Sequence, residues 1–177
     1  TIAVIGCGTI GLGVILSAGC YAPKKIIGID VVDFNLEKAK EMGADITLNS
    51  MRDAVVDEVM KLTEGKGVDI TFLAFGNKSC MRQAAEITKN GGIISEIAVM
   101  DNEVPAPFGI IQVKELHVVG SNMYTRKDFK AVINGISNGK IKLDGFVSKR
   151  FPVEKMKEAM EYADKRLEPQ VKVILEF

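Results

Sequence analysis

The first eleven residues carry the feature that most constrains the fold of this chain, a short apolar run followed by spaced glycines. The run Ile2–Ile5 is rich in β-branched residues and predicts a short buried strand. The turn after it reads G-C-G-T-I-G. A second apolar run, K-I-I-G-I-D, ends on Asp30, about 20 residues beyond the last of these glycines. Strand, glycine-rich turn, second strand and acid together predict a dinucleotide-binding βαβ unit.

Each glycine of this turn has its own physical task. We expect Gly6 to allow the tight turn, Gly8 to let a pyrophosphate approach the backbone, and Gly11 to let the next helix pack close to the strand. The N-terminal end of that helix then faces the phosphates with free N–H groups and a positive dipole. The first-turn residues Thr9 and Ile10 are therefore expected to contact the cofactor as well.

Asp30 decides which dinucleotide is favoured. A carboxylate at this position can accept both hydroxyls of the adenosine ribose, with Val31 beside it. A 2′-phosphate would meet like charge there, so NAD is favoured over NADP. Two alternatives remain at this point. One is a turn that merely needs glycines. The other is a methyltransferase, although the two-residue spacing before Gly11 favours a dinucleotide.

Composition excludes several function classes. A chain of 177 residues can build one domain with a full core. Lys+Arg and Asp+Glu are both 23, so we expect neither nucleic acid nor an anionic membrane as a partner. No apolar run approaches the roughly 18 residues of a membrane span, and no basic region precedes the apolar start. These patterns predict a cytoplasmic protein without a signal peptide.

The cysteines and the histidine do not form a recognisable metal site. Cys7, Cys20 and Cys80 are dispersed, and we interpret them as reduced, small apolar residues. His117 is the only histidine and lies in the apolar stretch Leu116–Val119, which favours an ordinary strand residue. Residues in this pattern match no usual zinc site, so we predict neither a metal site nor a catalytic residue within the chain.

Short apolar runs alternate with amphipathic stretches along most of the chain. This alternation predicts an α/β fold with a doubly wound parallel sheet, the Rossmann fold, in strand order 3-2-1-4-5-6. The expected strands are 2–5, 25–30, 45–48, 68–72, 93–97 and 116–119. The expected helices are 9–20, 34–42, 77–88 and one that Ser50-x-x-Asp53 starts and that ends near residue 62. A looser stretch with Pro105 and Pro107 precedes the sixth strand.

In such a sheet the cofactor lies across the carboxyl ends of strands one and four. Two loops at that edge are expected to contact it, one directly after strand four and one after strand five, deeper towards the nicotinamide. Their residues are Ala74, Phe75, Gly76, Ile97, Ala98 and Val99.

After the sixth strand the character of the sequence changes. Thr125-x-x-Asp128 predicts the start of a helix, whose apolar positions are Phe129, Val132, Ile133 and Ile136. An extended stretch, a second helix from Pro152 and a last strand over 171–177 follow. The second helix has an apolar stripe that we expect to be core, formed by Val153, Met156, Met160, Ala163 and Leu167. We therefore divide the chain into a dinucleotide-binding domain, 1–122, and a C-terminal helix-strand appendix, 123–177.

These segments, taken in order, resemble the medium-chain, zinc-type alcohol and polyol dehydrogenases. The segments that carry the resemblance are G-C-G-T-I-G, I-I-G-I-D, N-L-E-K-A-K-E-M-G-A-D, G-K-G-V-D-I-T-F-L-A-F-G, N-G-G-I-I-S-E-I-A-V and V-K-V-I-L-E-F. No single stretch settles the matter, but the ordered series covers the whole chain. A methyltransferase would not share it.

The resemblance implies an activity that this chain does not contain in full. In that family a separate N-terminal domain holds a catalytic zinc that polarises an alcohol oxygen, and NAD takes the hydride. The chain looks like the cofactor half of such an enzyme, excised or truncated, so we expect it to be inactive alone. Its substrate would be a secondary alcohol or polyol, and residues 123–177 would pack on the absent domain. The alternative is a non-catalytic NADH-binding sensor or interaction module.

Three further expectations rest on the resemblance. Lys172 matches a basic position that can reach the pyrophosphate, although it can also be an ordinary solvated strand residue. Asn35 stands where the family often has arginine, which removes a possible partner for a 2′-phosphate. The family pairs subunits edge to edge, so we expect a homo-oligomer through the sixth strand, Leu116–Val119, and the loop before it.

Overall fold

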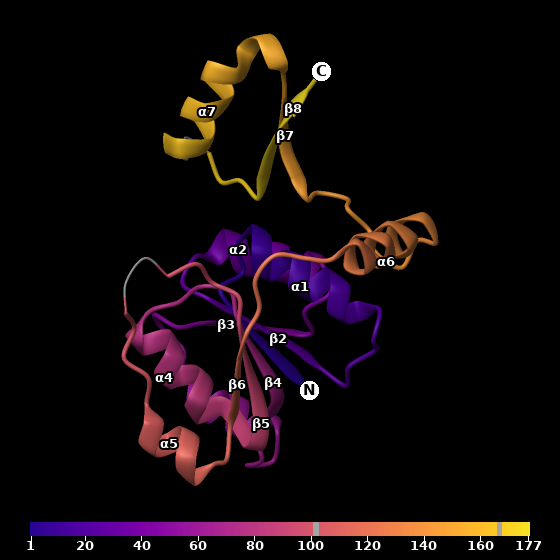
Figure 1. Cartoon of the computed structure of the whole chain (residues 1–177). Coiled ribbons are helices and arrows are strands. Elements are labelled where there is room, and N and C mark those ends of the chain that lie inside the picture. The colour runs from indigo at the N-terminus through magenta and orange to yellow at the C-terminus, as the bar shows by residue number, and fades with distance from the viewer. Residues whose placement is uncertain (101–102, 166–167) are drawn as a thin grey trace. The chain divides into compact units, whose positions relative to one another are not determined.

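The chain folds into two compact units, Thr1–Ile141 and Lys142–Phe177 (Figure 1). The computed structural model describes residues 1–100, 103–165 and 168–177. Within these ranges no helix combines the length and the apolar character that crossing a bilayer requires. The division between the compact units falls later in the chain than the functional boundary expected near residue 123. It is a division by packing and does not test that boundary, which stays a prediction.

The first unit is built on one parallel sheet in the order β3-β2-β1-β4-β5-β6. This confirms the predicted doubly wound arrangement and its strand order. The strands are β1 (Ile2–Ile5), β2 (Ile26–Asp30), β3 (Ile46–Asn49), β4 (Val68–Leu73), β5 (Thr88–Glu96) and β6 (His117–Gly120). Because all six are parallel, their carboxyl ends meet at one edge, where ligands bind in folds of this kind.

Helices cover both faces of this sheet. The helices are α1 (Thr9–Gly19), α2 (Asp33–Glu41), α3 (Val55–Leu62), α4 (Lys78–Ile87) and α5 (Phe108–Val113). In Figure 1, α1 and α2 lie on one face, and α4 and α5 lie on the other. Side chains of α3 and α4 form a single apolar core with the strands, including Val59, Ala84 and Ile27. A strand covered on both faces is buried throughout and needs apolar residues on both sides. β1 is such a strand, since all of its residues are apolar and buried.

The stretch before β6 is more ordered than the sequence indicated. We expected a loose segment after Pro105, but residues Phe108–Val113 form α5, and Pro107 is its N-cap. A proline just before a helix costs no hydrogen bond, because the first N–H groups of a helix lack partners in any case. The prolines therefore mark the start of a short helix.

Two element starts also differ from the expectation. The strand expected from Ile93 begins at Thr88, which pairs with Val68 before the register shifts. Ser50 does not cap the helix that follows β3: α3 begins at Val55, with Ala54 as N-cap and no side-chain cap. The side chain of Asp53 instead accepts a hydrogen bond from the N–H of Asn49 at 2.6 Å, which closes the loop back onto β3.

The first unit ends with α6 (Arg126–Ser137), where the predicted capping box is confirmed. Thr125 accepts from the N–H of Asp128, whose carboxylate accepts from the N–H of Thr125. Gly135 is the buried residue of this helix and packs on Ile141. Its apolar positions are exposed: Phe129, Val132, Ile133 and Ile136.

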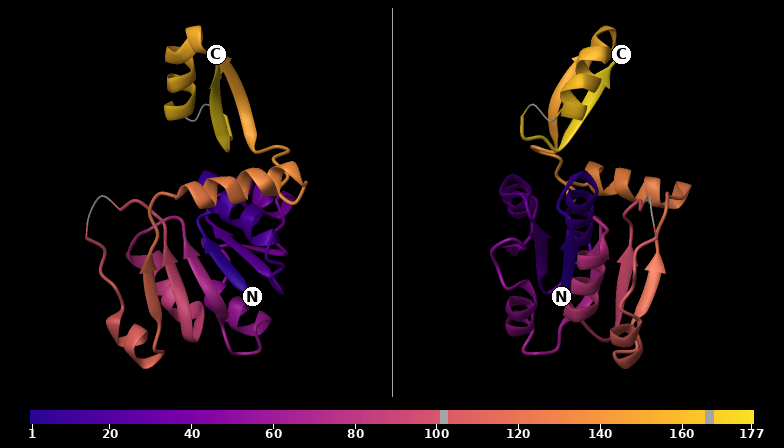
Figure 2. Two further views of the ribbon diagram at one scale, coloured as in Figure 1. Left: turned by 45° about the vertical axis from the view of Figure 1, so that its right-hand side comes forward. Right: turned by 90° about the vertical axis from the view of Figure 1, so that its left-hand side faces the viewer.

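The second unit is a small βαβ arrangement. Its elements are β7 (Val147–Pro152), the 3₁₀ turn η1 (Val153–Lys155), α7 (Met156–Lys165) and β8 (Lys172–Glu176). β7 and β8 pair in parallel, and α7 connects them (Figure 2). The core consists of Phe151, Ala159 and Tyr162, with the two rings 5.7 Å apart.

The apolar stripe expected on this helix was assigned wrongly. Ala159 and Tyr162 face the strands, whereas Met156 and Met160 are 54% and 66% exposed. Ala163 is exposed as well, and Val153 is only partly buried. A single helix over two strands buries only a narrow face. Ala159 and Tyr162, which are three residues apart, fill this face and pack with Phe151. Leu167, the last member of the expected stripe, lies outside the described residues.

Candidate cofactor-binding site

The glycine-rich turn between β1 and α1 is packed tightly where the prediction required it. Gly6 has a φ of +89°, and a Cβ on it would lie 2.6 Å from the Cβ of Phe75. A Cβ on Gly11 would lie 1.8 Å from the carbonyl oxygen of Gly6. No other residue fits at either position without a shift of the backbone.

Gly8 is different, because the space beside it is empty. No atom lies within 4 Å of the place where its Cβ would be. It is the N-cap of α1, with an ordinary φ of −73°, and no side chain caps the helix there. The N-terminus of α1 therefore meets open space, as an incoming phosphate group requires.

Asp30 ends β2 and is held by four N–H donors. Its Oδ1 accepts from the backbones of Val31 at 2.7 Å and Val32 at 2.9 Å. Its Oδ2 accepts from the backbone of Cys7 at 2.6 Å and from the amide of Asn35 at 3.2 Å. The bond from Cys7 ties the carboxylate directly to the glycine-rich turn. The acid and the turn that the sequence places far apart are thus one structural unit.

The thiol of Cys7 is a packing group. The side chain is buried, and its Sγ lies 3.6 Å from the carbonyl oxygen of Ile29. Burial, and then the nearby carboxylate of Asp30, raise the pKa of Cys7 to about 12. The thiol therefore stays protonated at neutral pH, as expected for a small apolar residue.

A second layer of polar residues surrounds Asp30, and the sequence reading did not identify it. Asn49 is buried at the end of β3, and its amide donates to Asp33 at 2.8 Å and to the carbonyl of Val31 at 3.3 Å. Arg52 pairs with both carboxylate oxygens of Asp33, at 2.7 Å to Oδ1 and 2.9 Å to Oδ2. The signal in the sequence was a polar residue ending a strand next to the one that ends on Asp30.

The two predicted loops lie at the carboxyl edge of the sheet, and the first of them bonds to the end of β1, directly before the glycine-rich turn. The backbone N–H groups of Ala74 and Phe75 both donate to the carbonyl of Ile5, at 2.8 and 3.1 Å. The N–H groups of Ile97 and Ala98 both donate to the carbonyl of Leu73, at 3.0 Å. Phe75 and Val99 are 59% and 90% exposed, so both loops leave apolar surface at this edge of the sheet.

The remaining predicted site residues differ in where the structure places them. Thr9 and Ile10 lie in the first turn of α1, and Gly76 follows Phe75 in its loop, under the side chain of Met100. Lys172 begins β8 in the second unit and is exposed there. Its contact with a pyrophosphate stays a prediction.

Most of the first unit, including this turn, matches a known protein family. The family of zinc-binding dehydrogenases matches residues 6–138, most of the first unit. The chain belongs to this family. The match covers the glycine-rich turn, Asp30 and both loops at the carboxyl edge.

Individual relatives agree with the family. A sorbitol dehydrogenase of Bombyx mori is 34% identical over 92% of the chain and 47% of its own length. The crystal structure of 2R,3R-butanediol dehydrogenase from Bacillus subtilis superposes with a TM-score of 0.91 at 28% identity, over all of this chain and 50% of that one. An alcohol dehydrogenase from Escherichia coli CFT073, solved with NADH, gives a TM-score of 0.88 at 26% identity, over 100% and 52%. This zinc-binding dehydrogenase chain therefore spans about half the length of the relatives it matches.

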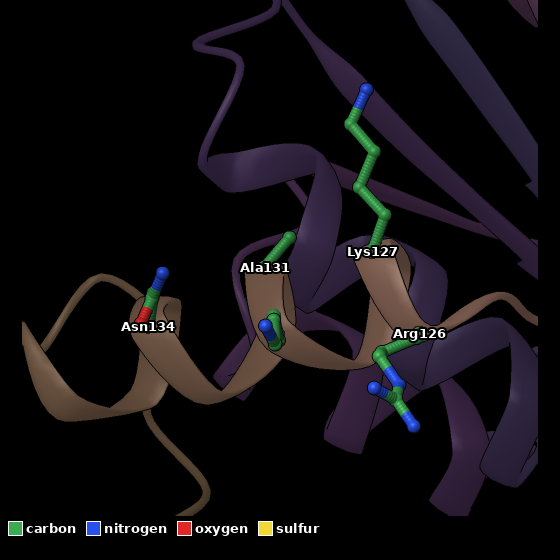
Figure 3. Close-up of a pocket in the computed structure, with 5 residues that line it drawn as sticks. Arg126, Lys127, Ala131 and Asn134 are labelled. Carbon is green, nitrogen blue, oxygen red and sulfur yellow. The ribbon is translucent and has the colours of Figure 1, made fainter.

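Neither of two other features of the chain forms a ligand site. In the ranges that the structure describes, no three His, Cys, Asp or Glu side chains come together in a way that could hold a metal ion. An open hollow lies on α6, lined by Arg126, Lys127, Lys130, Ala131 and Asn134. Figure 3 shows Arg126 and Lys127 extending from opposite sides of the helix. Because every lining residue comes from one helix, this hollow has only one wall, and we assign no ligand to it.

Proposed function

We propose that this chain is the NAD-binding portion of a zinc-dependent dehydrogenase that moves a hydride between a secondary alcohol or polyol and NAD. The observation that carries the proposal is the bond from Cys7 N–H to Asp30 beside the open Gly8. It fixes the phosphate-binding turn and the ribose-binding acid in one geometry. The sorbitol and butanediol dehydrogenases among its relatives favour a polyol or secondary alcohol as the substrate class.

The residues present fit two groups of NAD, the pyrophosphate and the ribose of the adenosine. The space beside Gly8 suits the pyrophosphate, and the carboxylate of Asp30 suits the ribose hydroxyls. When bound, NAD supplies the hydride acceptor. The chain's own residues bind and orient it: Phe75 and Val99 supply apolar surface at the carboxyl edge, and Lys172 is a proposed partner of the pyrophosphate.

The same proposal leaves the zinc to another part of the enzyme. The described residues do not fit a zinc site, since no suitable ligand group exists among them. No step of the alcohol chemistry is therefore assigned to residues of this chain, and we expect no turnover from it alone. The exposed apolar side of α6, including Phe129 and Ile133, agrees with a further domain that covers it.

We also propose that copies of the chain associate through β6. This strand forms one edge of the sheet, and His117, Val118 and Val119 are all exposed. An apolar edge strand presents unpaired backbone groups to a second copy. The alternative of a non-catalytic NADH sensor needs the same cofactor site, and no specific observation favours it over the dehydrogenase.

A titration with NADH tests the proposal. The chain contains no Trp, so the emission of bound NADH can be followed without interference from tryptophan. We expect saturable binding by the wild-type chain. Replacing Gly8 with Val should abolish it, because the new side chain fills the space meant for the pyrophosphate while the φ of this residue suits any amino acid.

The matched control is Gly13→Ala, which also points into empty space but lies further along α1. We expect this variant to bind NADH like the wild type. The proposal is wrong if the folded wild-type chain shows no binding at millimolar NADH, or if Gly8→Val binds as well as Gly13→Ala.

A further inference from the structure

The carboxyl ends of β2 and β3 hold an ion pair beside the proposed ribose site. Asp30 and Asn49 are direct neighbours in the register of these strands, and the N–H of Ser50 donates to the carbonyl of Asp30 at 2.9 Å. In the loop that follows, Arg52 meets Asp33 in a two-pronged arrangement, Nη1 to Oδ2 at 2.9 Å and Nη2 to Oδ1 at 2.7 Å.

The pair is fixed to the ribose site by one buried side chain. The amide of Asn49 donates to Asp33 and to the carbonyl of Val31, the residue after Asp30. Asp33 begins α2, and Asp30 and Asp33 flank the two N–H groups that hold Asp30 in place, those of Val31 and Val32. Asp30, Asp33 and Arg52 thus belong to one network at one end of the sheet.

The chemistry of the pair concerns recognition more than stability. Both side chains are about 60% exposed, at 61% for Arg52 and 59% for Asp33, and exposed pairs of this kind contribute little to folding. A guanidinium is the preferred protein group for a phosphate, because its fork matches two phosphate oxygens. Here that fork is occupied by Asp33. The hydrogen bond from Arg52, and then that from Asn49, hold the pKa of Asp33 below its ordinary value, so the carboxylate stays charged at neutral pH.

We propose that Asp33 is a positioning residue that withholds Arg52 from a 2′-phosphate, and that the pair thereby determines cofactor specificity together with Asp30. Asp30 would exclude NADP directly by its charge, and Asp33 would exclude it by occupying the guanidinium that could bind the extra phosphate. This inference rests on the proposed function. It extends that function by naming a second specificity determinant whose side chain lies outside the glycine-rich turn.

The test is a set of variants titrated with NADH and NADPH by calorimetry. Asp30→Asn keeps an acceptor for the N–H groups of Val31 and Val32 but removes the charge, and we expect its NADPH affinity to rise about tenfold, because the repulsion of the 2′-phosphate is lost. Asp33→Asn alone leaves Asp30 in place and should change the NADPH affinity little. The double variant frees Arg52 and removes both charges. We expect it to bind NADPH about tenfold or more tightly than Asp30→Asn, the effect of one charge-assisted phosphate contact.

Two controls test whether Arg52 causes the gain in NADPH affinity. Adding Arg52→Met to the double variant should remove the gain in NADPH affinity while leaving NADH affinity close to that of the double variant. We expect the Asp33→Asn substitution to change NADPH affinity by releasing Arg52. The matched control is therefore the loss of a carboxylate that pairs with a different arginine. Glu86→Gln breaks the pair of Glu86 with Arg82 on α4 and should not alter the preference between cofactors.

The outcomes separate this inference from the proposed function. If the wild-type chain binds neither cofactor, the proposed function fails, and the specificity argument fails with it. If the wild type binds NADH but the double variant gains no more NADPH affinity than Asp30→Asn, or keeps its gain after Arg52→Met, only the role of Asp33 and Arg52 is overturned.

Discussion

The three glycines of the β1–α1 turn have different surroundings, as their separate positions in the motif predict. The space beside Gly8 is open, whereas the space beside Gly11 is filled by the protein itself, since a Cβ there would lie against the carbonyl of Gly6. Gly6 needs both a positive φ and room for Phe75. A substitution at Gly8 should therefore affect binding, and one at Gly11 should affect folding.

The first prediction compares two glycines of the same helix. Gly11→Ala places a methyl group 1.8 Å from a backbone oxygen, so we expect it to lower the free energy of unfolding by about 3 kcal/mol or more. Gly13→Ala meets no atom within 4 Å and should raise that free energy by roughly 0.5–1 kcal/mol, because alanine favours the helix. Urea unfolding of both variants checks this. Equal effects would contradict the assigned packing.

At the level of elements, single polar side chains satisfy helix ends in a way that the sequence pattern does not predict. The last carbonyls of α4 have no partners within the helix, and the ammonium group of Lys114 donates to those of Ala85 and Glu86, both at 2.9 Å. Lys114 directly follows α5, so one side chain ties α5 to the end of α4. Partial burial lowers the pKa of this lysine, in spite of the nearby carboxylate of Glu86.

We expect Lys114→Met to lower the free energy of unfolding by about 1–2 kcal/mol, because two helix carbonyls lose a charged donor. Lys61→Met, on the exposed side of the last turn of α3, is the control and should change it by less than about 0.5 kcal/mol. Thermal unfolding at neutral pH distinguishes the two. If the variants are equally stable, the Lys114 contact does not hold the end of α4.

The elements that sequence reasoning identified correctly are those with strong local signals. Alternating apolar runs predicted every strand of the main sheet, and Thr125 with Asp128 predicted the start of α6. The errors arose where partners come from elsewhere. Ser50 has the right neighbours for a cap, but Asp53 bonds back to β3, and Met156 and Met160 have helical spacing but no strand to cover them.

The candidate site shows the same division. The glycines and Asp30 could be predicted because the roles proposed for them depend on backbone conformation and on spacing along the chain. The donors that hold Asp30, and the layer formed by Asn49, Asp33 and Arg52, depend on which strand lies beside β2. The predicted strand order placed the third strand, which Asn49 ends, beside β2. No local pattern shows which side chains pair across that edge, so these contacts became visible only in the folded chain.

At the level of the whole molecule, exposed apolar surface is the main feature that the chain itself does not explain. β6 is an unpaired edge, and Val118 and Val119 are exposed along it. We predict that the wild-type chain is a dimer in sedimentation experiments and that Val119→Lys makes it a monomer, because a charged edge strand resists pairing.

The control for this prediction is Tyr21→Lys. Tyr21 is a large exposed residue, at 86% against 51% for Val119, but it lies beyond the end of α1 and away from the edge strand. We expect this variant to remain a dimer. A monomeric wild type, or a dimeric Val119→Lys variant, would show that β6 is not the association surface.

We propose that the chain binds NAD through one unit formed by the glycine-rich turn and Asp30. The most direct test is the ratio of NADPH to NADH dissociation constants for the wild-type chain, measured by calorimetry in one buffer at fixed salt. Because a 2′-phosphate would lie against the carboxylate of Asp30, we predict that NADH binds at least about tenfold more tightly. Equal affinity for the two cofactors, or no binding of either by the folded chain, would show that the turn and Asp30 do not form an NAD site.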